Sequence, residues 1–237
     1  QACEATGTKL SLIPLYAEYM PANPQIDSFN GLPMINLRRI PLDNLGNAFM
    51  KRAMDIVGSV LLIVLTSPIM LFAAIGVKLS SPGPVIFRQM RVGLNKKVFY
   101  MYKFRSMRVN EGSDTRWSTN HDDRKTAFGA FIRKFSIDEL PQFFNVLKGD
   151  MSLVGPRPEI PHFVEQFKTE IPLYMVKHQV RPGITGWAQV NGLRGDTSIE
   201  ERIQHDIYYI ENWTIFFDIR ILFLTLWRGI VNKEKLH

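Results

Sequence analysis

The 237-residue sequence predicts an α+β protein attached to a membrane by one helix–break–helix element that enters and leaves on the same side. Three observations support this prediction. A run of 22 residues without charge, Ile56 to Val77, has basic residues on both sides. Short strand patterns bounded by glycine and proline follow it, and helical patterns then continue toward the C-terminus. We therefore expect a membrane-associated, monotopic protein with a mostly helical cytosolic lobe and a small sheet.

Composition excludes several classes of protein. Apolar residues make up 46% of the chain and charged residues 22%, which is ordinary globular usage. The single cysteine, Cys3, rules out an internal disulfide framework and any multi-cysteine metal site. No zinc-protease, dinucleotide-binding or P-loop motif is present, and the five histidines show no ligand spacing. Chemistry must therefore come from other residue types.

The excess positive charge is concentrated in one part of the chain. The net charge is +7, yet the stretch from Lys51 to Arg108 holds ten basic residues and a single acid, Asp55. Basic residues beside an apolar segment attract anionic lipid. No nucleic-acid motif accompanies them, so we expect membrane lipid as the partner and no nucleic acid.

The apolar segment is long enough to cross a bilayer, at ~1.5 Å per residue against a ~30 Å hydrocarbon core. Ser67-Pro68 lies at its centre, where proline removes a backbone donor and serine can bond the freed carbonyl. Because both ends are basic, the positive-inside rule places them on the same side. We expect residues 46–79 to form an amphipathic lead-in and a re-entrant membrane helix. A kinked spanning helix and a buried core helix are the alternatives.

The flanking segments have different characters. Residues 1–45 are rich in proline and read as the tail of an upstream domain or a linker, with a strand or two. Residues 85–88 and 98–105 predict strands around a glycine turn, and Lys103 and Arg105 then share a strand face. A solvated face is the alternative for these two side chains. Residues 110–125 predict a polar loop.

Helical patterns dominate the rest of residues 80–237, the expected catalytic domain. A helix is expected to end at Lys148-Gly149, its apolar stripe formed by Leu140, Phe143, Phe144 and Leu147. A short strand at 151–154, a helix at 162–180 broken near Pro172, and turns at 181–183 and 192–195 follow. Residues 200–231 predict one or two aromatic-rich helices with a polar face at Asp218 and Thr225. They lie either at the membrane interface or in the core.

The chemical candidate is the acidic pair Asp138-Glu139. Ser136 to Glu139 is also a capping-box pattern, which is the structural alternative. Pro141 is tolerated only near a helix start, and this phase places the acids beside free backbone N–H groups. A carboxylate there, near Arg133 and Lys134, could attack phosphorus to form an acyl phosphate, while its neighbour binds a metal ion or moves a proton.

Arg157 is the second candidate. It lies between Pro156 and Pro158, and a residue before proline is held extended, so a stiff loop projects its guanidinium. Arginine suits bidentate binding of phosphate. A structural ion pair is the alternative.

Several motifs follow one another in a specific order: Lys51-Arg52 with Asp55, Ser67-Pro68, Ser81 to Pro84, Lys103 to Met107, Arg133 with Ser136 to Gln142, Gly149 to Pro158, and Arg181 to Gly186. Together they resemble the bacterial sugar transferase family over roughly residues 48–237. This family comprises monotopic polyprenyl-phosphate sugar-1-phosphate transferases that begin exopolysaccharide and O-antigen synthesis. Residues 1–45 resemble the end of the Rossmann-like domain of larger members, so the chain looks like the catalytic part of such a protein.

The resemblance implies transfer of a hexose-1-phosphate from a UDP-sugar to undecaprenyl phosphate, with Mg²⁺, at the cytoplasmic face of the bacterial inner membrane. It implies that Asp138 is the nucleophile that forms a phosphosugar–aspartyl intermediate. Glu139 matches the partner carboxylate that binds metal or handles a proton, and the pair is the expected metal site. Arg157, with Pro156 and Pro158, matches the loop that holds the nucleotide. Further basic positions near the phosphates are matched by Lys103, Arg105 and Arg133.

Four questions stay open in the sequence. Residues 181–196 and the ending Gly229 to Lys233 resemble family members that transfer glucose-1-phosphate most, with members that transfer galactose-1-phosphate as the alternative. The lipid phosphate could attack directly, with Asp138 only binding metal. A basic membrane-surface scaffold or nucleic-acid binder without catalysis is the non-enzymatic alternative. The oligomeric state is also open, a homodimer included.

Overall fold

The computed structural model describes residues 25–29, 32–36, 40–107, 126–193, 195 and 197–231. Residues 1–40 and 41–237 form two compact units. In the first, β1 (Gln25–Phe29) and β2 (Leu32–Asn36) pair as an antiparallel hairpin. The second unit holds the other elements. The predicted loop at 110–125 lies outside the described residues.

The longest element is α2 (Leu45–Ser80), which begins where the Asn44 side chain accepts hydrogen bonds from the N–H groups of Gly46 and Asn47. It is long and apolar enough to cross a membrane, and most of its apolar stretch is exposed. A helix of this kind with little protein around it indicates membrane association.

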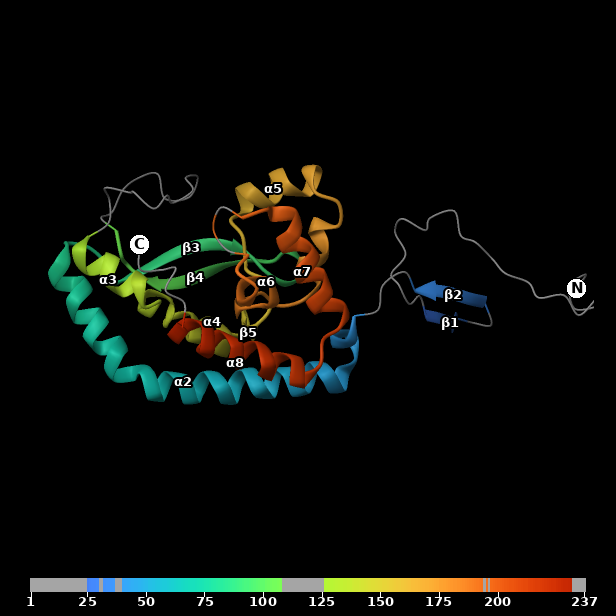
Figure 1. The fold of residues 1–237 in the computed structure, drawn as a ribbon, viewed down its shortest axis with the longest axis horizontal. Helices are drawn as coiled ribbons and strands as arrows, with labels where there is room; N and C mark the ends of the chain where they lie inside the picture. The colour runs from blue at the N-terminus through green and yellow to red at the C-terminus, as the bar shows by residue number, and fades with distance from the viewer. Residues whose placement is uncertain are drawn as a thin grey trace, which may run out of the picture. The chain divides into compact units, whose positions relative to one another are not determined.

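At Ser67-Pro68 the sequence predicts two helices separated by a break, whereas α2 runs through as one helix that bends along its length (Figure 1). The prolyl nitrogen of Pro68 cannot bond the carbonyl of Val64. The Ser67 hydroxyl donates to that carbonyl at 2.8 Å, as predicted. Thr66 donates to the carbonyl of Leu62 in the same way. These hydroxyls help the helix to continue past its proline.

Both halves of α2 contact the same folded unit. In the first half, the buried side chains are polar: Lys51, Asp55 and Ser59. In the second half, Ala73 and Val77 are buried against Phe104 and Ile132. The outward side carries exposed apolar residues, among them Val57, Leu61, Val64, Leu65, Leu71, Phe72 and Ile75.

The chain after α2 forms short strands and helices. β3 (Ile86–Val92) and β4 (Val98–Phe104) pair antiparallel, with Phe87 opposite Lys103. β5 (Ser152–Val154) and β6 (Gly183–Thr185) pair in parallel. The helices are α3 (Ala127–Lys134), α4 (Gln142–Lys148), α5 (Pro161–Glu170), α6 (Trp187–Val190), α7 (Ile199–Glu211) and α8 (Ile215–Val231). A 3₁₀ turn, η4 (Ile137–Glu139), precedes α4, and another, η5 (Tyr174–Gln179), follows α5.

Three local predictions need correction. β3 extends to Val92 rather than ending at Arg88, because its outer half pairs with the start of β4. The turn predicted at 181–183 ends earlier, because Gly183 already belongs to β6 and this extended chain pairs with β5. The apolar stripe predicted on α4 is not its buried face. That face is formed by Gln142, Asn145 and Val146.

Asn145 explains the inward polar face of α4. Its side-chain oxygen accepts from the N–H of Tyr102 at 2.9 Å, and its side-chain nitrogen donates to the carbonyl of Tyr100 at 2.7 Å. The amide thus pairs with the free edge of β4 as a neighbouring strand would. The predicted stop at Gly149 is confirmed, since Gly149 ends α4 with φ 89°.

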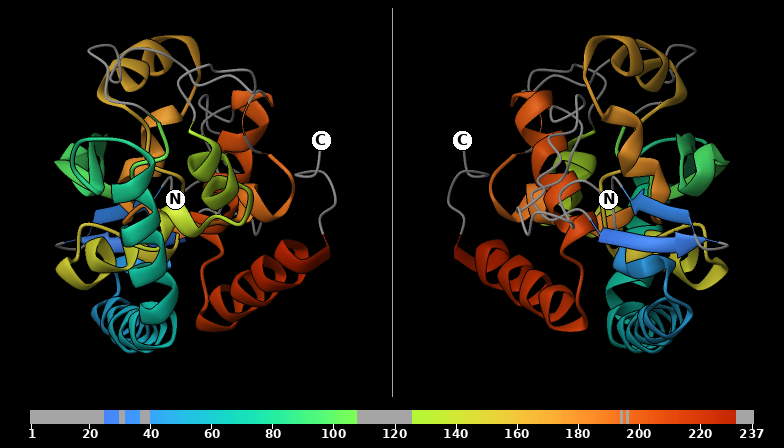
Figure 2. Two further views of the ribbon diagram at one scale, coloured as in Figure 1. Left: turned by 90° about the vertical axis from the view of Figure 1, so that its left-hand side faces the viewer. Right: turned by 90° about the vertical axis from the view of Figure 1, so that its right-hand side faces the viewer.

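The last helix, α8, turns polar residues toward the folded unit and leaves apolar residues exposed. α8 lies on the same side of the unit as the first part of α2 (Figure 2). Its polar residues Asp218 and Thr225 face inward: Asp218 is fully buried, and the Thr225 hydroxyl bonds that of Thr185. Its exposed residues are apolar: Phe216, Ile219, Phe223, Leu226 and Trp227.

Candidate active site

The acidic pair lies in the η4 turn between α3 and α4. Ser136, just before it, adopts a left-handed conformation with φ 57° and caps no helix with its side chain. The capping-box alternative is therefore not formed. Asp138 is 7% exposed, while the Glu139 side chain is 25% exposed. The turn separates two neighbouring carboxyls into a buried one and an accessible one.

Glu139 is surrounded by cations from two distant segments. Lys103, on β4, donates to its Oε1 at 2.9 Å. A guanidinium nitrogen of Arg157 lies 3.5 Å from the same oxygen. Two predicted site residues, Lys103 and Arg157, thus meet at the carboxylate of a third, Glu139. Arg157 therefore also forms the ion pair that was its structural alternative. The two cations are partly exposed, so they remain within reach of an anionic ligand.

Asp138 holds its proton more tightly than an ordinary aspartic acid. Burial, and then the charge of Glu139, raise its pKa to about 6. The positive charges of Lys103 and Arg133 act in the opposite direction without cancelling the rise. Arg133 is thereby placed in the electrostatic environment of Asp138. An oxygen nucleophile with a pKa near 6 is ionised at neutral pH yet poorly solvated.

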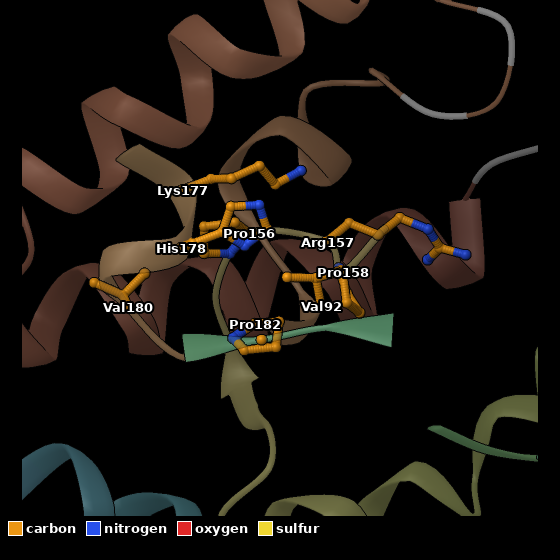
Figure 3. Close-up of a pocket in the computed structure, with 9 residues that line it drawn as sticks. Val92, Pro156, Arg157, Pro158, Lys177, His178, Val180 and Pro182 are labelled. Atoms are coloured by element: carbon orange, nitrogen blue, oxygen red, sulfur yellow. The ribbon is translucent and has the colours of Figure 1, made fainter. Parts of the chain in front are cut away.

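The Pro-Arg-Pro loop follows β5 and lines a pocket with residues from β3 and η5 (Figure 3). Pro156 and Pro158 contribute to the lining together with Lys177 and His178. Arg157 extends outward from the loop, away from Val180 and Pro182 (Figure 3). The prolines thus face the pocket, whereas the guanidinium reaches toward Glu139.

A buried set of charges holds this loop, and the sequence interpretation missed it. Glu159 lies 3.6 Å from Arg91 and 3.5 Å from Arg202, and all three side chains are largely buried. Its carbonyl accepts from the N–H of Val92, and Arg91 also donates to the carbonyl of Pro158. In the sequence, the only sign of this set is Glu159 itself, an acid two residues after Arg157. Its partners are remote in sequence, so only folding brings them together.

Arg105 lies elsewhere. It follows β4 and donates to the carbonyls of Val77 and Ser81 at the end of α2, so Lys103 and Arg105 do not act on one carboxylate. The physical reason is that α2 leaves unpaired carbonyls at its C-terminus, which attract a buried cation. Arg105 therefore fixes the end of α2 beside the strand that carries Lys103.

The donor chemistry of the pair fits Mg²⁺. Among the described residues, no group of three or more His, Cys, Asp or Glu side chains is arranged to hold a metal ion. Mg²⁺ commonly needs only one or two carboxylates, with water and substrate phosphates completing its shell. Asp138, whose negative charge is incompletely balanced, is the stronger candidate ligand, because Glu139 already has two cations.

Fold and site together define a membrane-associated α+β protein with a cation-lined carboxylate pair. The chain belongs to the bacterial sugar transferase family, whose model matches residues 46–232. This confirms the resemblance drawn from the motifs.

Relatives with assigned activities are similar over most of the chain. The UDP-glucose:undecaprenyl-phosphate glucose-1-phosphate transferase of Escherichia coli K12 is 46% identical over 96% of this chain and 50% of its own length. That of Klebsiella pneumoniae is 48% identical over 88% of this chain and 46% of its own. The UDP-N-acetylgalactosamine-undecaprenyl-phosphate N-acetylgalactosaminephosphotransferase of Aeromonas hydrophila is 54% identical over 76% and 43%. The chain therefore spans about half the length of these relatives.

Proposed function

We propose that the chain transfers a hexose-1-phosphate, glucose-1-phosphate in particular, from a UDP-sugar to undecaprenyl phosphate and releases UMP. One observation carries this proposal: the buried Asp138 lies beside a carboxylate held by Lys103 and Arg157, on the same folded unit as an exposed apolar helix. A donor soluble in water and an acceptor dissolved in lipid require a site at the interface. The names of the relatives in Escherichia coli and Klebsiella pneumoniae support these two substrates.

The chemistry that we propose is a double displacement. An ionised oxygen of Asp138 attacks the sugar-bearing phosphorus of the UDP-sugar. An oxygen–phosphorus bond forms, the bond to the second phosphate breaks, and UMP leaves with the electron pair. A phosphate oxygen of the lipid then attacks the same phosphorus and releases the Asp138 carboxylate. The two substrates thus react one after the other at Asp138, which suits one substrate from water and one from lipid.

The charged residues of the site have different roles in this proposal. Arg157 and Lys103 neutralise the pyrophosphate, because both already lie against a carboxylate oxygen and are within reach of an anionic ligand. Glu139 keeps the two cations in place before the substrate arrives. Asp138 and Glu139 are the proposed Mg²⁺ ligands, and the ion would supply further charge neutralisation at the phosphates.

We also propose that α2 is re-entrant and that the site faces the cytoplasm at the bacterial inner membrane. Support comes from both halves of the helix. Lys51 donates to the carbonyl of Val154 and pairs with Asp218, while Val77 is packed against Phe104 at the other end. Two ends that pack on one folded unit belong on one side of the bilayer. Cysteine labelling at positions 50 and 80 should reach both from one side. Labelling from opposite sides would contradict this topology.

A UMP-release assay across UDP-sugars tests the proposed function. With undecaprenyl phosphate and Mg²⁺, UDP-glucose should give the highest kcat/KM in a panel that includes UDP-galactose and UDP-N-acetylgalactosamine. Preference for another sugar would change the hexose and leave the reaction class intact. Salt-sensitive binding to nucleic acid without UMP release would contradict the enzymatic proposal.

A further inference from the structure

Four phenylalanine rings form a continuous row from the membrane helix to the acidic pair. Phe72, on α2, lies 5.9 Å from Phe128 on α3, measured between ring centroids. Phe128 lies 6.1 Å from Phe131, and Phe131 lies 5.2 Å from Phe135. The helical spacing places the last three on one side of α3 and its end. We call these four residues the aromatic row.

The backbone beneath the row is built to let its rings approach closely. A Cβ at Gly76 of α2 would lie 2.1 Å from the ring of Phe128, so this ring rests on bare helix backbone. On the other side of α3, a Cβ at Gly129 would lie 2.0 Å from the carbonyl oxygen of Ser106. Both glycines fix α3 tightly between α2 and the end of β4.

The outer rings of the row are not needed for the core. Ile132 of α3 is fully buried with Ala73 and Val77, and the first ring of α3, Phe128, is partly buried against the same cluster. Phe131 and Phe135, by contrast, are 45% and 60% exposed. Exposed neighbouring rings that add little to the core are typical of a surface for an apolar partner.

The row also has a polar end. Arg133 lies between Phe131 and Phe135 in the sequence, and its charge acts on Asp138. Its Nη1 atom is buried and has no hydrogen-bond partner among the described residues. The left-handed Ser136 then turns the chain, so Phe135 stays exposed while Asp138 is buried. An apolar surface that ends three residues before Asp138, a carboxyl on which the charge of Arg133 acts, matches a long hydrocarbon with one anionic end.

We propose that the aromatic row binds the isoprenoid chain of the lipid acceptor and leads its phosphate to Arg133 and Asp138. This inference rests on the proposed function and adds the place where the acceptor lies. The row starts on the lipid-facing side of α2 and ends three residues before the reacting carboxylate. The exposed rings of α8, Phe223 and Trp227, belong to a helix whose buried residues bond Lys51 and Thr185 instead. These two rings are exposed and stack on each other rather than on the rings of α3.

Acceptor chain length separates this role from simple attachment to the membrane. We would compare undecaprenyl phosphate with farnesyl phosphate, a short isoprenoid phosphate that covers less of the row. In Phe131→Ala/Phe135→Ala, kcat/KM for undecaprenyl phosphate should fall about 10-fold or more, which is about the loss of one good apolar contact. With farnesyl phosphate it should fall less than about 3-fold. Phe131→Leu/Phe135→Leu should recover much of the preference for the long acceptor, because leucine keeps apolar area.

The matched control is Phe223→Ala/Trp227→Ala, which removes two exposed rings from α8. This control should lower membrane attachment without changing the ratio between the two acceptors. Equal losses for both acceptors in the Phe131→Ala/Phe135→Ala variant, or the same change of ratio in the control, would overturn the inference while leaving the proposed function intact. Absence of transfer by the unaltered chain to either acceptor would instead refute the proposed function.

Discussion

Two buried aspartates of this protein sit in opposite environments. Asp218 on α8 accepts three side-chain hydrogen bonds: from Lys51 at 2.7 Å, from Tyr209 at 2.8 Å and from Trp213 at 3.1 Å. Asp138 has a pKa raised to about 6 by burial and by Glu139, with Lys103 and Arg133 giving partial compensation. A carboxylate that is fully bonded holds elements together, whereas one that is incompletely balanced is available for chemistry.

The position of each aspartate agrees with this difference. Asp218 joins the start of α2, the end of α7 and the start of α8, and Lys51 extends the same network to the carbonyl of Val154. It lies where α2 meets α7, α8 and the carbonyl of Val154. Asp138 lies in a turn beside a loop arginine and a strand lysine that are partly exposed. The four predictions below test this division between attachment and catalysis.

The largest expected effect is on activity. In Asp138→Asn the nucleophile is lost, because an amide cannot form the acyl phosphate, and UMP release should fall by at least about 10³-fold. Glu165→Gln, an exposed acid on α5, is the control and should retain activity. Activity of Asp138→Asn within about 10-fold of the native value would remove Asp138 from the covalent role.

Asp218→Asn should act on stability instead. It leaves the buried Lys51 without its counter-charge, and loss of one partner of a buried pair destabilises by about 3–5 kcal/mol. Denaturant unfolding in detergent would measure this change. The double variant Lys51→Met/Asp218→Asn should recover part of the loss, since the buried ammonium is then removed with its partner. The recovery should be incomplete, because Lys51 also compensates the charge of the buried Asp55. A loss below about 1 kcal/mol would show that the network does not attach α2.

Asp138→Asn should, in contrast to Asp218→Asn, stabilise the fold. A carboxyl whose folded pKa is about 6, above its ordinary value of 3.8, weakens folding as pH rises from about 4 through 6. The neutral amide avoids this loss, so at pH 7 the gain should reach up to about 3 kcal/mol. It should shrink toward zero below pH 4. Unfolding in the presence of EDTA at both pH values checks the sign, and a pH-independent difference would contradict it.

The smallest expected effect concerns the loop that carries Arg157. Glu159→Gln keeps the shape of the side chain but loses its charge between Arg91 and Arg202. The loop should then hold Arg157 less firmly, so KM for the UDP-sugar should rise about 10-fold with a smaller change in kcat. Glu165→Gln is the control, because this exposed acid on α5 pairs with Lys168 instead. If both variants change KM equally, Glu159 has only a structural role.

Much of the fold was predictable because local signals agreed with the tertiary structure. The long apolar segment, the serine that bonds the carbonyl freed by Pro68, the β3–β4 pairing and the stop at Gly149 all follow from spacing and from short-range chemistry. The inward polar face of α4 could not be predicted in this way. Asn145 is buried because it bonds to β4, and an apolar pattern cannot indicate such a bond. Pairing of β5 with β6 joins segments about 30 residues apart, which periodicity does not register.

The site was predictable to a similar extent. Asp138, Glu139 and Arg157 were identified from residue type and stiff loops, and Lys103 joins them in space. Strand alternation predicts that Arg105 shares a face with Lys103, whereas Arg105 donates to the Ser81 carbonyl at the end of α2. The buried ion pairs of Glu159 and the raised pKa of Asp138 depend on tertiary packing, so the sequence alone does not reveal them.

The most direct test of the central claim is to look for the covalent bond on Asp138. The protein in detergent would be incubated with UDP-glucose and Mg²⁺ without lipid acceptor, then digested and examined by mass spectrometry. We predict one hexose-phosphate on the peptide that contains Asp138, released when undecaprenyl phosphate is added. UMP formed only when the acceptor is present, with no labelled peptide, would contradict the account and favour direct attack by the lipid phosphate.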